Sequence, residues 1–166
     1  MTRTVLVAYA TKKGSTREVA EAIAATLRAH ELEVDVAAAG DAHDLHRYSA
    51  IVLGGAIYLG RWHQDARRFL ARHRADLAMV PFVVFGMGPR TLSEKDVNES
   101  RAQLERALGH FPDLHPLSVA IFGGVLDPAK LSFPLNRMEA VDARDWDAIE
   151  AWAVEVATTL TALALA

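Results

Sequence analysis

The sequence predicts a three-layer α/β fold, in which helices cover both faces of a doubly wound, five-stranded parallel sheet. Short apolar runs alternate with longer segments whose apolar residues recur at helical spacing, a pattern typical of successive βαβ units. Most of the apolar runs are continuous, as in strands that are covered on both faces. The chain has 166 residues, 51% of them apolar and 23% charged, so we expect residues 1–166 to form one globular domain.

The first half of the chain contains three predicted strands and one clear helix. The strands are expected at residues 5–9, 34–38 and 50–55. The helix begins at Ser15, because Ser15-Thr16-Arg17-Glu18 has the pattern of a capping box. Its buried stripe consists of Val19, Ala20, Ile23, Ala24 and Leu27. Residues 40–48 join the second and third strands and are long enough only for a turn or a distorted helix.

The second half continues the alternation. A helical stripe follows the third strand, formed by Trp62, Ala66, Phe69, Leu70, His73 and Leu77. Strand four is predicted at 81–85 and strand five at 117–122, separated by a helix whose stripe Arg101 interrupts. The last helix is expected to bury Trp146, Ile149, Ala153, Val156, Leu160 and Leu163, with Trp152 also a packing residue. We predict the strand order 2-1-3-4-5.

Four unusual loops leave the C-terminal ends of the predicted strands, at residues 10–16, 56–62, 86–92 and from 123 onward. Ligands of open α/β sheets bind at these strand ends, where the strand order reverses. The first loop, Thr11-Lys12-Lys13-Gly14-Ser15-Thr16, combines three hydroxyls, two cations and a glycine at a helix N-terminus. Such a loop is suited to a terminal phosphate. A plain capped turn would explain Ser15 or Thr16 but not the whole set.

The same hexapeptide resembles the flavodoxin phosphate loop, [ST]-x-T-G-x-T, with Lys13 in place of the middle threonine. Residues 54–63 are similar to a narrower group in that superfamily, the menaquinone-dependent protoporphyrinogen IX dehydrogenases, which carry G-x-[SA]-I-x-x-G-x-x-H in this loop. Residues 119–124 and Arg144-Asp145-Trp146 resemble the same group. The segment from 125 to 143 departs from it, because the dehydrogenases have a longer, apolar and basic insertion there.

The resemblance implies a flavodoxin-like fold that binds FMN. The phosphate would be held by Thr11, Lys12, Lys13, Gly14, Ser15 and Thr16. One side of the flavin ring would be lined by Ile57, Tyr58, Leu59, Gly60 and Arg61, and the other by Gly86, Met87, Gly88 and Pro89, with Gly123 and Gly124 near the ring's edge. Glycines suit such loops because the backbone can approach a flat ring closely. No side chain is assigned as a catalytic acid, base or nucleophile.

The implied function is that of a cytoplasmic, FMN-dependent oxidoreductase resembling protoporphyrinogen or quinone-linked dehydrogenases. The alternative is a flavodoxin-type electron carrier that acts with protein partners. The expected partner is therefore a redox protein or a small molecule of the quinone or porphyrin kind, and peripheral membrane contact and a homo-oligomer are left open. Residues near the flavin also leave alternatives: Tyr58 is either a stacking or a packing residue, and His63 either a proton relay or the start of a helix. Core packing is favoured for Trp62.

Composition and spacing exclude several other classes of protein. Without cysteine, the chain has no disulfide, thiolate metal site or Cys nucleophile. A net charge of −3 argues against a nucleic-acid-binding protein. We also expect no secretion signal and no transmembrane segment. The spacing of Asp41, His43, Asp44 and His46 fits no common metal site.

Overall fold

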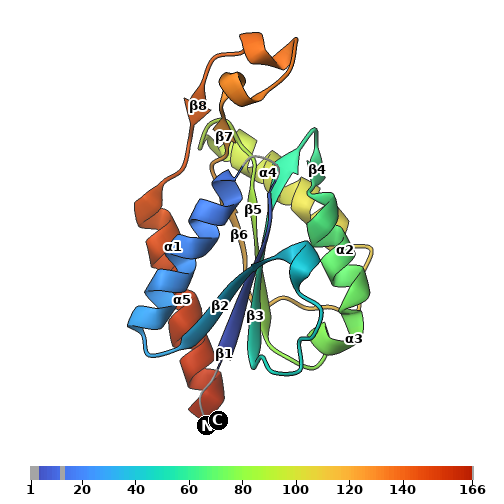
Figure 1. Ribbon diagram of the computed structural model, residues 1–166, viewed down its shortest axis with the longest axis vertical. Coiled ribbons are helices and arrows are strands. Elements are labelled where there is room, and N and C mark those ends of the chain that lie inside the picture. The colour runs from blue at the N-terminus through green and yellow to red at the C-terminus, as the bar shows by residue number, and fades with distance from the viewer. Residues whose placement is uncertain (1–3, 12–13, 166) are drawn as a thin grey trace.

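The computed structural model describes residues 4–11 and 14–165 and contains the predicted parallel sheet (Figure 1). Five parallel strands lie in the order β2-β1-β3-β5-β6, and a two-residue strand, β4, pairs with the end of β3. Their bounds are β1 Thr4–Ala10, β2 Glu33–Ala38, β3 Ala50–Tyr58, β4 Arg61–Trp62, β5 Phe82–Met87 and β6 Val119–Phe122. Counted as the five predicted strands, this is the order 2-1-3-4-5, so the predicted fold and topology are confirmed.

Helices cover both faces of the sheet (Figure 1). Helices α1 (Ser15–Ala29) and α5 (Trp146–Leu165) pack on one face, and α2 (Gln64–Arg72), α3 (Arg74–Leu77) and α4 (Glu94–Leu108) lie on the other. Each face buries its own apolar cluster, as expected of a doubly wound sheet. The connection between β2 and β3 holds only a 3₁₀ turn, Ala39–Asp41, in line with its predicted brevity.

The stripe that begins at Trp62 is not one continuous helix. Trp62 lies in β4, where its side chain is 1% exposed and Nε1 donates a hydrogen bond to the Gly55 carbonyl at 3.0 Å. Helix α2 begins only after His63, whose Nδ1 accepts a hydrogen bond from the Asp65 amide. It ends at Arg72, because His73 turns inward and its Nε2 donates to the Ala42 carbonyl at 2.9 Å. Core packing of Trp62 is confirmed, but its placement in a helix is wrong.

The two tryptophans of α5 occupy different environments. Trp152 is buried against Phe85 and Phe122, and its Nε1 donates a hydrogen bond to the Ser118 hydroxyl. Trp146, predicted to be buried, is 43% exposed. It is the first residue of α5, and the Arg144 guanidinium lies over its ring.

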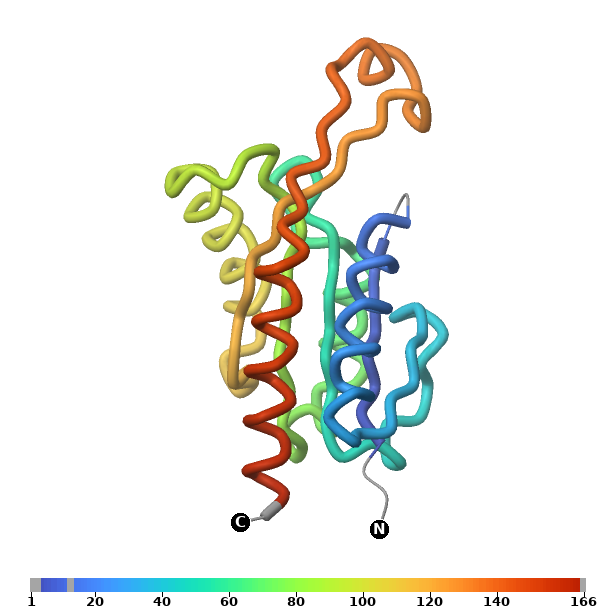
Figure 2. The backbone as a smooth tube through the Cα atoms, turned by 90° about the vertical axis from the view of Figure 1, so that its left-hand side faces the viewer, coloured from blue at the N-terminus to red at the C-terminus, as the bar shows by residue number. Residues whose placement is uncertain are grey.

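Residues 125–142, here called the arm, project beyond the C-terminal ends of the strands (Figures 1 and 2). The base of the arm is an antiparallel pair, β7 (Val125–Leu126) and β8 (Val141–Asp142). Two 3₁₀ turns, Pro128–Lys130 and Leu135–Arg137, shape its outer part. In both views the arm leans over the start of α1. Across the described residues, no helix is long and apolar enough to cross a membrane.

The buried imidazole of His73 makes folding stability depend on pH. Burial holds the pKa of His73 below its ordinary value, so the unfolded chain takes up a proton first as the pH falls. We therefore expect the free energy of unfolding to decrease below about pH 6.5, with a slope from this group of at most about 1.4 kcal/mol per pH unit. His73→Gln keeps an N–H donor but cannot be protonated, and should reduce this slope.

The measurement is chemical denaturation of both proteins at several pH values between about 5 and 8, the range that spans histidine titration. The matched control, His110→Gln, replaces an exposed histidine and should retain the wild-type slope. Parallel stability curves for the wild type and His73→Gln would contradict the assignment.

Candidate functional site

Four strands reach the same line at the C-terminal edge of the sheet. Ala10 of β1 pairs with Gly55 of β3, Gly55 with Gly86 of β5, and Gly86 with Ile121 of β6. The loops predicted to carry the chemistry leave the sheet at this line or shortly after it. The parallel register thus brings the four loops to one edge, where ligands of such sheets bind.

The loop between β1 and α1 ends in an unusual helix start. Gly14 has φ of +93° and is the residue before the first helical turn, and its amide donates to Thr11 Oγ1 at 2.9 Å. A Cβ at Gly14 would meet no atom within 4 Å, so the glycine is needed for its backbone conformation rather than for space. Lys12 and Lys13, also predicted to hold the phosphate, lie outside the described residues.

The predicted capping box does not form. Gly14 occupies the N-cap position and no side chain caps α1. Glu18 instead forms an ion pair with Arg144, 126 residues along the chain. Thr16 is fully buried, and its Oγ1 has no hydrogen-bond partner in the described part of the chain. An unpaired buried hydroxyl is costly and uncommon, so this atom requires an explanation.

A bound phosphate would satisfy the start of α1. The first amides of any helix lack an acceptor within the helix and point along its axis toward an anion. The Thr16 hydroxyl could donate in the same place. Thr11 Oγ1 accepts from Gly14, which leaves its own proton for a further acceptor. Gly14, Ser15, Thr16 and Thr11 therefore fit an anion with several oxygen atoms.

The second loop is a tight hairpin between β3 and β4. Tyr58 pairs with Arg61, and the two residues between them, Leu59 and Gly60, have φ of 49° and 78°. Positive φ at both central positions is the conformation that favours short hairpins, although it is strained for leucine. The Leu59 side chain is 82% exposed. The hairpin therefore presents an apolar tip and a glycine peptide at the edge of the sheet.

Other predicted flavin neighbours turn into the protein. Ile57 packs over Gly86 and Gly88, where an added Cβ would come within 2.9 and 2.8 Å of its side chain. Met87 is 2% exposed, and Pro89 is also buried. These glycines make room for Ile57. Ile57 and Met87 can thus support a ligand chiefly through their backbone and their packing.

Gly123 and Gly124 join the last loop to the base of the arm. A Cβ at Gly123 would lie 1.9 Å from the Ala143 carbonyl oxygen, so only glycine fits. The Gly124 amide donates to the Pro89 carbonyl at 2.9 Å, and the Ala143 amide donates to the Gly124 carbonyl at 3.0 Å. The loops at 86–89 and 123–124 consequently form one connected wall.

Tyr58 and Arg61 pair in the β3–β4 hairpin, which brings both residues to the same edge of the sheet as Gly14. Tyr58 is half-buried and Arg61 is exposed. His63 is the N-cap residue of α2, which is the second of the two roles predicted for it. In the described ranges, no three His, Asp or Glu side chains are arranged to hold a metal ion.

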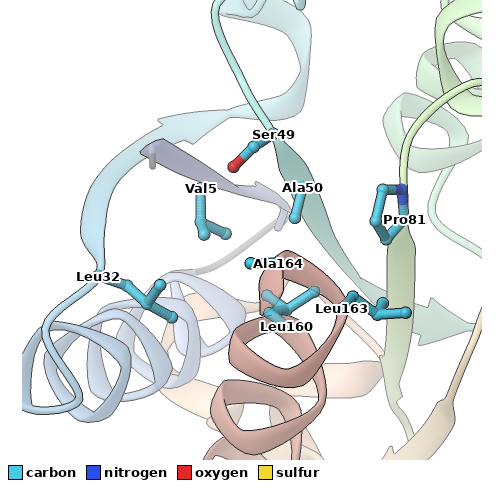
Figure 3. A pocket seen from close by; sticks show the side chains of 8 residues that line it. All are labelled: Val5, Leu32, Ser49, Ala50, Pro81, Leu160, Leu163 and Ala164. Carbon is cyan, nitrogen blue, oxygen red and sulfur yellow. The ribbon is translucent and has the colours of Figure 1, made fainter. Parts of the chain in front are cut away.

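An apolar crevice of about 190 Å³ lies at the opposite end of the sheet (Figure 3). It is lined by Val5, Leu32, Ser49, Ala50, Pro81, Leu160, Leu163 and Ala164. Ser49 is the one polar side chain among these, and its hydroxyl donates to the Thr4 carbonyl. The residues that line the crevice include no cation and no helix N-terminus.

Comparison with known proteins agrees with this geometry. The model of the flavodoxin domain family matches residues 6–138. The chain belongs to the flavodoxin domain family. A stretch of 90 residues is 27% identical to the protoporphyrinogen IX dehydrogenase [quinone] of Escherichia coli strain K12. That match covers 49% of this chain and 46% of the relative, so it spans about half the length of each protein.

Solved flavodoxin structures show the same fold over nearly the whole chain. Oxidised flavodoxin 2 from Bacillus cereus superposes with a TM-score of 0.60 and 24% identity, covering 94% of this chain and 99% of that one. A mutant flavodoxin from Pseudomonas aeruginosa superposes with a TM-score of 0.62 and 18% identity, covering 95% and 99%. The rubredoxin oxygen:oxidoreductase from Desulfovibrio gigas gives a TM-score of 0.62 at 14% identity, with 98% of this chain on 37% of that one.

Replacing Thr16 by valine should stabilise the protein when no ligand is present. The change removes a buried hydroxyl that has no partner among residues 4–11 and 14–165, at nearly constant side-chain volume, and relief of its desolvation is worth about 1 kcal/mol. Chemical denaturation of ligand-free protein measures the gain. In the control variant, Thr158→Val, an exposed hydroxyl bonded to the Val154 carbonyl is removed, and no gain is expected. A loss of stability in Thr16→Val would show that the hydroxyl is bonded within the protein.

Proposed function

We propose that this protein binds FMN at the C-terminal edge of its sheet and acts as an oxidoreductase. The observation that carries the proposal is the buried Thr16 hydroxyl at the start of α1, which has neither a hydrogen-bond partner nor a capping side chain among the described residues. A ligand that ends in a phosphate supplies the missing acceptor there. The family match and the flavodoxin structures support FMN as that ligand, because they share this fold.

Different residues of the chain bind the phosphate and the ring of FMN. The first amides of α1, with Thr16 and Thr11, hold the phosphate. The hairpin at 58–61 and the wall formed by 86–89 and 123–124 border the ring, and the exposed Leu59 side chain gives apolar cover. Bound FMN supplies transfer of electrons or hydride, and the protein supplies position and electrostatics.

For the reaction class, we favour a dehydrogenase that passes electrons to a quinone-like acceptor from a porphyrinogen-like substrate. Support comes from the 27% identity to the dehydrogenase over 90 residues, which extends the likeness seen in the hairpin loop. The second candidate is an electron carrier. The carrier is favoured because this chain superposes on 99% of the flavodoxin 2 chain, whereas its sequence match to the dehydrogenase covers 46% of that protein. Sustained turnover of a porphyrinogen with a quinone identifies the enzyme, and reduction without turnover identifies the carrier.

The decisive binding test compares FMN with riboflavin, which lacks the phosphate. Flavin fluorescence titration should show FMN bound at least about tenfold more tightly, the scale of one hydrogen bond to a charged group. Thr16→Val should weaken FMN binding about tenfold and leave riboflavin binding unchanged, because only the phosphate contact is lost.

Thr158→Val, on the exposed face of α5, serves as the control and should bind both flavins as the wild type does. Equal affinity of the wild type for FMN and riboflavin would exclude the phosphate site. Failure to bind either flavin would exclude the whole proposed function.

A further inference from the structure

Arg144 connects the arm to the helix that begins at the phosphate loop. Its Nη1 lies 2.5 Å from Glu18 Oε2 in the first turn of α1. Its Nε and Nη2 donate to the two oxygens of Asp142 in β8 at 3.0 and 2.8 Å. The Arg144 side chain is 11% exposed and packs over the Trp146 ring at 4.9 Å. A guanidinium held on three sides has one defined position.

The base of the arm therefore spans the edge of the sheet. On one side, Gly124 and Ala143 tie it by backbone hydrogen bonds to the loop that contains Pro89. On the other side, Arg144 ties it to α1. Figures 1 and 2 show the arm rising from this base and leaning over the start of α1. A ligand that occupies the phosphate loop would lie beneath the arm.

Glu18 also matters for an anion at this helix start. A carboxylate in the first turn of a helix is favourable when no ligand is present, because it faces the positive end of the helix dipole. The same charge repels a phosphate placed at that end. Arg144 is shared between Glu18 and Asp142, so it offsets part of the negative charge of Glu18, two residues beyond Thr16. Removing the arginine would strengthen the repulsion of a phosphate by Glu18.

We propose that Arg144 is a positioning residue of the phosphate site, which offsets part of the charge of Glu18 and fixes the arm against α1. Phosphate binding and the order of the arm are then coupled, and each strengthens the other by the same factor. This inference rests on the proposed FMN site, but its structural half, the attachment of the arm, exists without the ligand.

The electrostatic half is tested with Arg144→Gln, Glu18→Gln and the double variant. Arg144→Gln should weaken FMN binding about three- to tenfold, the range of a partly exposed charge interaction. Glu18→Gln should bind FMN more tightly than Arg144→Gln, because the repelling charge is gone while the arm is released in both variants. The double variant should likewise bind FMN more tightly than Arg144→Gln, because Glu18 no longer repels the phosphate. Wild-type affinity in Arg144→Gln, or a double variant as weak as that single one, would overturn the electrostatic role.

The attachment of the arm is tested by hydrogen exchange of residues 125–142 in protein without ligand. Both Arg144→Gln and Glu18→Gln should lose protection in the arm, since either change breaks the same ion pair. Arg137→Gln is the control and should keep the wild-type protection at the base of the arm, because the Arg137 guanidinium lies over Phe133 within the arm. Glu18 is 62% exposed in its side chain, so its variant tests the link even where Arg144→Gln folds poorly.

Adding FMN to the wild type should increase protection of the arm, and both variants should lose most of that increase. Unchanged protection in the two variants would overturn the attachment. If the wild type binds no FMN, the proposed function fails, while the comparison of unliganded proteins still decides whether Arg144 holds the arm.

Discussion

The proposed phosphate site depends on the buried hydroxyl of Thr16, at a helix start that no described side chain caps. A hydroxyl enclosed without a partner in the described part of the chain lowers stability. Valine would fill the same space. The proposed phosphate would supply an acceptor for this hydroxyl from outside the chain. Gly14, with its left-handed backbone, is the N-cap residue of α1.

The rest of the edge is built to keep that site in place. Gly86 and Gly88 admit Ile57, Gly123 admits the Ala143 carbonyl, and Gly55 admits the indole of Trp62. Gly86, Gly88 and Gly123, which the sequence predicts to border the flavin, therefore also allow the loops to pack against one another. The resulting frame is closely packed on the β3–β6 side and is linked to α1 through Arg144. This combination suits a site that holds a large planar cofactor by its phosphate at one end and its ring at the other.

Most of the strands and helices could be predicted from the sequence, because the periodicity of the apolar residues reports burial directly. Continuous apolar runs located the parallel strands, and helical stripes located α1, α4 and α5. The errors have specific causes. Trp62 lies at helical spacing from Ala66 and Phe69, yet its indole is held by Gly55 in a hairpin. The residues at 15–18 have the pattern of a capping box, but Glu18 pairs with an arginine 126 residues away. No local pattern contains such a partner, and only the topology brings the two together.

A crystal structure of the protein with FMN would show whether Thr16 and the start of α1 hold the phosphate of the flavin nucleotide. We predict a phosphate oxygen at hydrogen-bond distance, about 2.6–3.0 Å, from Thr16 Oγ1, and the flavin ring between the 58–61 hairpin and the wall at 86–89. A bound FMN whose phosphate lies away from α1, with the Thr16 hydroxyl still unpartnered, would contradict it.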